Sequence, residues 1–336
     1  TSINMAMQPF KMMVGDMVNE KQKGLAYSIQ SFLCNAGSLV GFLFPFIFTW
    51  IGISNIAPQG VVPDSVIYSF YIGAAILILC VIYTTVKVKE MPPAEYAEYH
   101  GITEEEKKEK INMVKLLVKA PKAFWTVGLV QFFCWFAFMF MWTYTNGSVA
   151  ANVFDAPTVE TVVNGANKVV LDTKSIQYQN AADWVGVLFA VQAIGSVLWA
   201  VCIPMFKNRK LIYSLSLVLG GIGFISTYFV HNQYVLFISF LLIGCAWAAM
   251  LALPFTILTN ALSGGHMGTY LGLFNGTICI PQIVAATLGG SILALFTPKG
   301  MLPPEINMLV MAGVMLIIGA VCVYLIKETK GEQAKA

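Results

Sequence analysis

Apolar residues fall into long runs along this chain, and short polar stretches separate them. Each run has roughly twenty residues, the length that an α-helix needs to cross the apolar core of a bilayer. The sequence therefore predicts eight full membrane-spanning helices: Leu25–Ile51, Val66–Val86, Phe124–Tyr144, Trp184–Phe206, Leu211–Val230, Tyr234–Leu258, Met267–Phe296 and Met308–Ile326.

A further apolar helix is predicted at the start of the sequence, and polar residues interrupt it at helical spacing. Asn4, Gln8 and Lys11 share one face, Pro9 lies inside the helix and Asp16 lies at its end. Polar and charged groups are costly at membrane depth, so we expect this face to line protein or a water-filled path. Asp16 is the only carboxylate on the interior side of a span, which makes it the candidate for a gating or proton-coupling role.

Composition indicates the same class of protein. Hydrophobic residues make up 57% of the chain, charged residues make up 11%, and the mean hydropathy is +0.72. Soluble domains have about 25% charged residues, so we predict an all-α polytopic membrane protein whose surroundings are a lipid bilayer. The net charge of +3 is small and gives no reason to expect a nucleic-acid partner.

The distribution of positive charge predicts the orientation. Of the 20 basic residues, 16 lie on one side of the predicted spans, eight of them in the 87–122 loop. The other side has only Lys168, Lys174 and Lys299. Because basic loops stay in the cytoplasm, we expect the 87–122 loop and the C-terminus there, in a plasma membrane of the bacterial inner-membrane kind.

The charged loop also suggests a division into two helical bundles. We predict a partial bundle at 1–86, a charged linker at 87–122, a six-helix bundle at 123–327 and a tail at 328–336. Two bundles joined by such a loop are typical of transporters with repeated halves. In the outer segment 154–182, β-branched runs around Asn164 and Gly165 predict a hairpin, which either caps the outer mouth or is a variable loop.

Neither metal chemistry nor enzyme chemistry is indicated. The seven cysteines all lie in apolar runs without CxxC spacing, and the three histidines lie in or beside loops, away from carboxylates at ligand spacing. Metal sites and catalytic triads need such groups to converge, so we expect no metal, no cofactor and no enzyme activity.

Two spans have residues suited to binding a sugar. Gln131, Trp135 and Trp142 share a face of the span Phe124–Tyr144, and sugars bind through aromatic stacking and amide hydrogen bonds. In the span Met267–Phe296, Asn275 and Gln282 lie on one stripe, although they could equally well join helices. Three glycines at four-residue spacing predict close helix packing there, and a proline predicts a bend: Gly268, Gly272, Gly276 and Pro281.

Taken together, these motifs resemble the major facilitator superfamily, and within it the proton-coupled transporters of sucrose, maltose and related glucosides. The residues of the opening helix match the fourth of that family's twelve helices: Asn4, Gln8, Pro9, Lys11 and Asp16. The family usually has arginine where Lys11 stands. Its eleventh helix is matched by Gly272, Phe274, Asn275, Ile278, Pro281 and Gln282, and the segment from Trp135 to Trp142 looks most like the bacterial members.

The resemblance implies a major-facilitator bundle in which this chain supplies the end of helix four and helices five to twelve, so that an N-terminal truncation is expected. It also implies a monomer that moves a disaccharide with a proton by alternating access. Gln131, Trp135, Asn275 and Gln282 would contact the sugar from one half, and Asn4 and Lys11 from the other. The alternatives are a carrier of another solute, such as a sodium-coupled sugar or a drug, and a non-transporting remnant.

Overall fold

The computed structural model describes residues 22–53, 64–89, 113–163, 166–261, 267–298 and 300–326, together with single residues at 10, 13, 14, 17, 18, 62, 92 and 95. Nine long or medium helices make up most of these ranges: α2 (Lys23–Trp50), α3 (Asp64–Lys87), α7 (Lys122–Asn152), α8 (Ile176–Cys202), α9 (Arg209–Ser226), α10 (Leu236–Ala261), α11 (Met267–Phe274), α12 (Gly276–Phe296) and α13 (Ile306–Cys322). Three short helices are also described: α6 (Met113–Val118), η1 (Ile203–Met205) and η2 (Val323–Leu325).

Every apolar run that the sequence predicts as a span is helical in the structure. Seven of the helical segments in the described part of the chain are long and apolar enough to cross a membrane, and the 28-residue helix α2 corresponds to the remaining prediction. The predicted all-α polytopic architecture is therefore confirmed.

Two helices begin or end well beyond the apolar runs. Helix α7 continues past Tyr144 to Asn152, and its polar residues there are satisfied by carbonyls one turn earlier: Thr145 Oγ1 donates to Met141 O, Ser148 Oγ to Tyr144 O and Asn152 Nδ2 to Ser148 O. Helix α8 begins eight residues before the predicted start at Trp184. Ser175 caps it, since its Oγ accepts a hydrogen bond from the backbone N–H of Tyr178 at 3.3 Å.

The predicted hairpin is present between α7 and α8. Strands β1 (Thr158–Val163) and β2 (Ala166–Leu171) pair antiparallel, with Val163 opposite Ala166. This register leaves two residues, 164 and 165, for the connection, as the Asn-Gly signal predicts.

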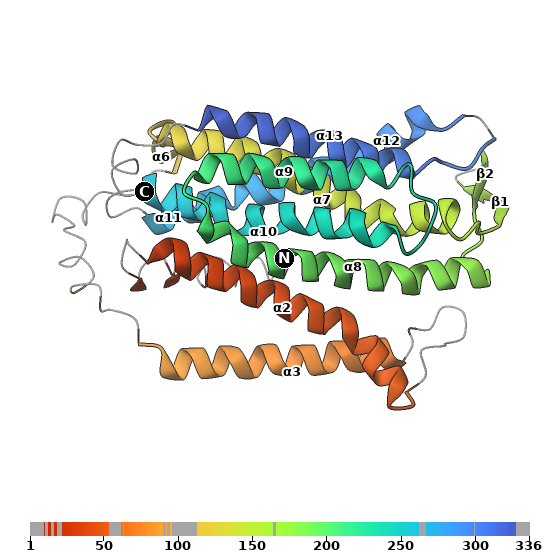
Figure 1. The fold of residues 1–336 in the computed structure, drawn as a ribbon, viewed down its shortest axis with the longest axis horizontal. Helices are drawn as coiled ribbons and strands as arrows, with labels where there is room; N and C mark the ends of the chain where they lie inside the picture. The colour runs from red at the N-terminus through yellow and green to blue at the C-terminus, as the bar shows by residue number, and fades with distance from the viewer. Residues whose placement is uncertain are drawn as a thin grey trace.

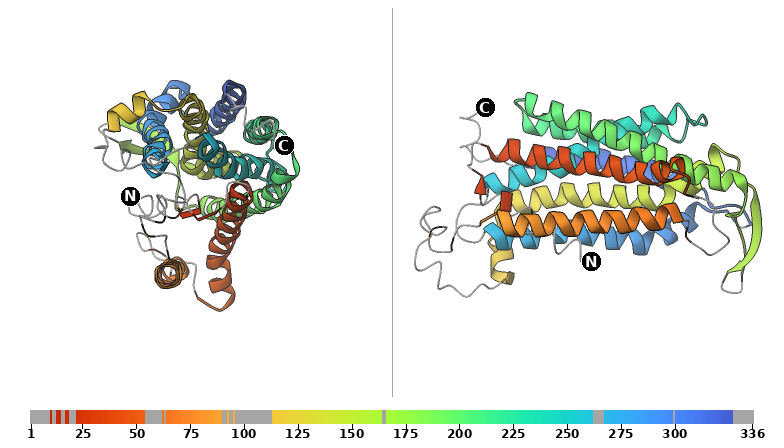
Figure 2. Two further views of the ribbon diagram at one scale, coloured as in Figure 1. Left: turned by 90° about the vertical axis from the view of Figure 1, so that its left-hand side faces the viewer. Right: turned by 90° about the horizontal axis from the view of Figure 1, so that it is seen from below.

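Helices α7 to α13 form one elongated bundle, and α2 and α3 lie along one side of it (Figure 1). We call the end with β1 and β2 the hairpin end. The opposite end, where α3 ends and α6 and α7 begin, we call the linker end. Helix α2 packs against α8 and α10 and slants away from the bundle toward the hairpin end, and α3 packs on α2 (Figures 1 and 2).

Helix α7 is the central helix of the bundle. It packs against α8, α10, α12 and α13, and buried residues occur all round it. A helix that is apolar on all sides is typical of the centre of a bundle or of a membrane span. Helix α3 is the opposite case: Ser65 is the one buried residue among those described in it, so its apolar surface is open to lipid or to protein.

Glycines bring the backbones of three helix pairs into direct contact. A Cβ on Gly195 would lie 2.6 Å from Leu241 O, where α8 meets α10, and one on Gly223 would lie 2.6 Å from Ser239 O, where α9 meets α10. Gly221 and Gly313 face each other between α9 and α13. Lipid offers no hydrophobic driving force between helices, so close packing of this kind holds the bundle together.

Gly244 provides a direct test of this packing. A Cβ there would overlap Gln192 O and lie 2.7 Å from Ser196 N, both backbone atoms of α8. We expect Gly244→Ala to lower the free energy of unfolding by about 1–3 kcal/mol, measured by thermal or denaturant unfolding in detergent.

Gly272→Ala is the matched control, because a Cβ there would meet no described atom within 4 Å. Its stability should stay unchanged or rise slightly, since alanine favours helix more than glycine. Equal losses in both variants would contradict the packing account.

Candidate functional site

Three tryptophans from two helices form an aromatic cluster in the bundle. Trp135 and Trp142 come from α7 and Trp247 comes from α10; we call them the tryptophan cluster. The ring centroids of Trp135 and Trp247 are 5.8 Å apart, those of Trp142 and Trp247 are 5.6 Å apart, and both pairs are edge-to-face. Phe138 packs against the cluster, with its ring centroid 4.9 Å from that of Trp247.

The cluster combines an open aromatic face with a free hydrogen-bond donor. Trp142 is 42% exposed, whereas Trp135 is 7% exposed and its Nε1 has no hydrogen-bond partner among the described residues. A buried N–H without a partner is costly unless a ligand or water pairs with it. An aromatic surface beside a free donor suits a sugar, which has apolar C–H faces and hydroxyl groups.

Gln131 lies on the same face of α7 but is placed differently from the prediction. It is 1% exposed, and its Nε2 donates a 3.0 Å hydrogen bond to Met250 O of α10. That carbonyl would normally pair with the N–H of residue 254, but residue 254 is a proline. The amide nitrogen of Gln131 therefore pairs with the carbonyl of Met250, which corrects the expectation that Gln131 contacts a sugar directly.

Asn275 and Gln282 lie on α12 and its boundary with α11, beside α7. The two helices run in the same direction: Gly128 meets Thr277, and Tyr144 meets Gly289, an offset of 145 to 149 residues. Gln282 therefore lies at about the depth of Trp135, and Asn275 lies nearer the linker end. Both are partly exposed, and neither side chain makes a hydrogen bond to another residue in the described part of the chain.

Two of the three glycines of this segment, Gly272 and Gly276, make no close helix contact with the described residues. A Cβ on Gly272 would meet no described atom, and one on Gly276 would meet only Ile280 of its own helix, at 3.8 Å. The reason is that α12 packs against α7 through another face, which contains Gly289. A Cβ on Gly289 would lie 2.6 Å from the hydroxyl oxygen of Tyr144. Gly268 lies partly buried in α11.

The span is interrupted at Asn275, whereas the bend predicted at Pro281 stays a prediction. Helix α11 ends at Phe274, α12 begins at Gly276, and α12 continues through Pro281. The N–H of Asn275 is shared between Leu271 O and Gly272 O, at 3.3 and 3.2 Å, so the backbone tightens there.

The predicted residues of the opening helix lie outside the described residues: Asn4, Gln8, Pro9, Lys11 and Asp16. Their assignment to the other wall of the site stays a prediction.

Two further side chains lie near the cluster. Asn146, which the sequence places below Gln131, Trp135 and Trp142 on α7, donates through Nδ2 to the Tyr178 hydroxyl of α8 at 2.9 Å, and its buried Oδ1 has no partner among the described residues. Sequence reasoning missed the second, Trp247. Trp247 belongs to an apolar run without polar spacing, so no signal in its own helix separated it from core residues.

Glu305, the residue before α13, is also new. Its carboxylate lies over the backbone of Gly147 in α7, and burial raises the pKa of the Glu305 carboxyl to about 7. It lies outside the membrane-spanning residues 306–325. Sequence reasoning missed it because it follows two prolines in a loop, where a carboxylate is normally solvated.

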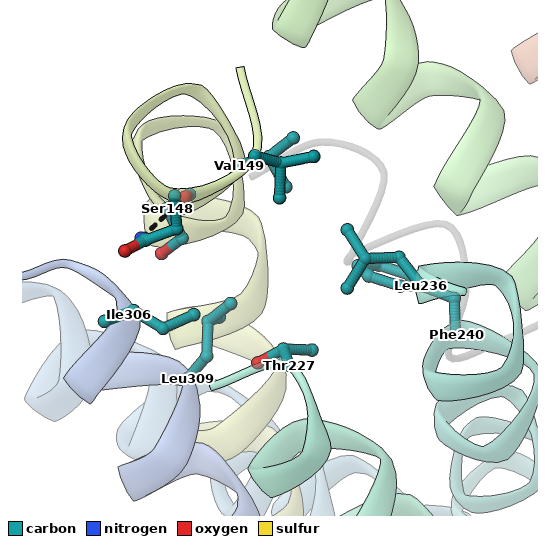
Figure 3. Close-up of a pocket in the computed structure, with 9 residues that line it drawn as sticks. Ser148, Val149, Thr227, Leu236, Phe240, Ile306 and Leu309 are labelled. Carbon is teal, nitrogen blue, oxygen red and sulfur yellow. Dashed lines mark hydrogen bonds between the residues drawn. The ribbon is translucent and has the colours of Figure 1, made fainter. Parts of the chain in front are cut away.

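A pocket at the hairpin end lies apart from the tryptophan cluster (Figure 3). Leu236, Phe240, Ile306 and Leu309 line much of it. Its polar groups bond to their own helices, as in the hydrogen bond from Asn152 Nδ2 to Ser148 O, so it has little to offer a sugar. Among the described residues, no group of three or more His, Cys, Asp or Glu side chains could hold a metal ion.

Comparison with known proteins gives a family for the sequence and a similar structure for the fold. The family model of the Major Facilitator Superfamily matches residues 3–164 and 160–336. The fold is similar to a crystal structure of FucP, the fucose:proton symporter of E. coli, solved as a variant. The TM-score is 0.58 at 13% identity, covering 94% of this chain and 72% of that one. At this identity the likeness concerns the fold alone. No curated protein matches the sequence.

The raised pKa of Glu305 predicts a pH-dependent stability. The folded state holds the proton up to about pH 7, whereas the unfolded carboxyl loses it near 4.5, so the folded state binds more protons between these values. Stability should therefore be highest at acid pH and fall as pH rises through this window, by at most about 3 kcal/mol.

Unfolding in detergent across this pH range tests the prediction. Glu305→Gln should remove this part of the fall in stability with rising pH, and Glu160→Gln, at an exposed position on β1, should leave it intact. If Glu305→Gln does not change how stability depends on pH, the dependence does not come from Glu305.

Proposed function

The chain belongs to the Major Facilitator Superfamily and is a transporter rather than an enzyme, and we propose that it moves a disaccharide such as maltose or sucrose together with a proton. The solute would pass by alternating access between two helical halves. The 13%-identical neighbour in fold is itself a sugar:proton symporter, which agrees with this assignment.

The observation that carries the proposal is the tryptophan cluster with its free polar groups. Trp142 presents an open ring face, Trp135 Nε1 is an unpartnered donor, and the Gln282 amide lies at the same depth on α12. A disaccharide has two rings, so it can stack on an aromatic surface and also reach amides several ångströms away. Asn275 would extend the polar rim toward the linker end.

The other wall of the path would come from the opening helix. We propose that Asn4, Gln8 and Lys11 bind the sugar from that side, because they share one face of an apolar helix. Asp16 remains the candidate for gating or coupling within that helix. The linker end would face the cytoplasm, since the basic residues are concentrated in its loops.

Uptake by membrane vesicles that contain the protein tests the proposal. Labelled maltose and sucrose should accumulate when a proton gradient is imposed, and accumulation should stop when an ionophore removes the gradient. Accumulation driven by sodium, or competition by aromatic drugs but not by sugars, would favour a carrier of the other kind and overturn the assignment.

Removing the exposed ring of the cluster should weaken sugar binding. We expect Trp142→Ala to raise the sugar concentration for half-maximal uptake about 10-fold, the loss of one stacking contact, while the amount of protein in the membrane stays the same. Trp142→Phe should lose less, because it keeps a ring face.

Trp125→Ala is the matched control. Trp125 lies on the same helix, is 54% exposed and is close to the linker end, away from the cluster. Equal effects of Trp125→Ala and Trp142→Ala on half-maximal uptake would contradict the site.

A further inference from the structure

Helix α10 contains a proline whose missing hydrogen bond is replaced from another helix. Pro254 leaves Met250 O without its usual partner, and Gln131 Nε2 of α7 donates to it at 3.0 Å. Gln131 and Met250 are each 1% exposed, so water does not compete for this bond. The fully buried Tyr213 of α9 also lies beside the Gln131 amide, but neither its hydroxyl nor Gln131 Oε1 has a hydrogen-bond partner of good geometry among the described residues, so the bond to Met250 is the one well-formed hydrogen bond of the amide there.

The proline divides α10 into two segments with different neighbours. The segment before it, from Leu236 to Met250, carries Trp247 and packs on the tryptophan cluster. The segment after it, which ends at Ala261, carries Phe255, whose ring stacks on Tyr27 of α2 with centroids 6.2 Å apart.

The contact of Tyr27 and Phe255 joins α2 to α10 near the linker end. Tyr27 and Phe255 are 2% and 3% exposed. Phe255 also packs on Phe274 of α11, 5.9 Å away, which in turn packs on Phe124 at the start of α7, 5.7 Å away. Four aromatic rings therefore join α2, α10, α11 and α7 at this end, whereas α2 slants away from the bundle toward the hairpin end (Figures 1 and 2).

We propose that Gln131 is a positioning residue that holds α10, through Met250 O, in the conformer in which Phe255 closes the linker end against Tyr27. This role rests on the proposed transport function and deepens it. The bond supplies the partner that Pro254 removes, at the point in α10 where the helix is held by one hydrogen bond fewer. A change in the direction of the segment that carries Phe255 would occur most easily at this point, so in opening the linker end Met250 O would exchange or lose its partner.

Loss of the Gln131 amide should favour the open conformer. A buried carbonyl left without a donor destabilises the closed state, by an amount equivalent to about 5- to 100-fold in the equilibrium between closed and open conformers. The reporter is the thiol introduced by Ser31→Cys. Ser31 lies one turn from Tyr27 on α2 and is 4% exposed when the end is closed.

The experiment measures the rate at which a membrane-impermeant maleimide labels that thiol in inside-out vesicles, without any sugar. The exposed Cys34 and Cys80 are replaced by serine, and the same background without Ser31→Cys gives the residual labelling. Gln131→Leu should raise the labelling rate about 5- to 100-fold. Thr145→Val is the matched control: it removes a buried hydroxyl of α7 that bonds only within its own helix, and it should change the rate less than about twofold.

Pro254→Ala separates this role from simple packing. Alanine restores the N–H that pairs with Met250 O inside α10, so Gln131→Leu should then change labelling by less than about twofold. If Gln131→Leu alone fails to fold, the double variant should still fold. The proposal is overturned if Gln131→Leu leaves labelling unchanged, or if its effect, on labelling or on folding, is as large in the Pro254→Ala background.

The outcome is independent of the solute. If Gln131→Leu opens the linker end but neither maltose nor sucrose changes the labelling rate of the parent protein, the positioning role is supported and the sugar assignment fails instead.

Discussion

Backbone groups inside an apolar layer must be paired within the protein, and the arrangement of this bundle depends on how that requirement is met. Most groups are paired inside regular helices. At Pro254 the helix cannot do so, and the amide of Gln131 pairs with Met250 O from the neighbouring helix. One buried side chain thereby joins α7 to α10 between the residues Trp247 and Phe255.

The same helices make two kinds of contact, through backbones and through aromatic rings. Gly195, Gly244 and Gly223 let α8, α9 and α10 touch through their backbones, which makes this part of the bundle resistant to deformation. Helix α2 adds a contact of a different kind, made by aromatic rings near the linker end. Ring contacts can separate and re-form without breaking a helix, so a rigid bundle with an aromatic contact to α2 suits the alternating access that we propose for this chain.

The sequence predicted the long helices of the described residues and the hairpin well, because span length, hydropathy and the Asn-Gly turn are local properties. It was weaker wherever a partner on another helix decides the outcome. Gln131 carries the same amide whether it binds a sugar or a carbonyl, and only the position of Pro254, more than a hundred residues away, distinguishes the two. The regular spacing of Gly272 and Gly276 predicted contact, yet Gly289 makes it, because α12 presents another face to α7. The division at 87–122 and the residues of the opening helix stay predictions.

We propose that the tryptophan cluster binds a disaccharide, and equilibrium binding to the purified protein distinguishes such a site from aromatic packing alone. Calorimetric titration with maltose and with sucrose should show saturable binding of one of them, and that binding should be lost when Trp142 and Trp247 are both replaced by alanine in a protein that remains folded. Saturable binding that survives the double replacement, or no binding of either sugar to the unaltered protein, would contradict the account.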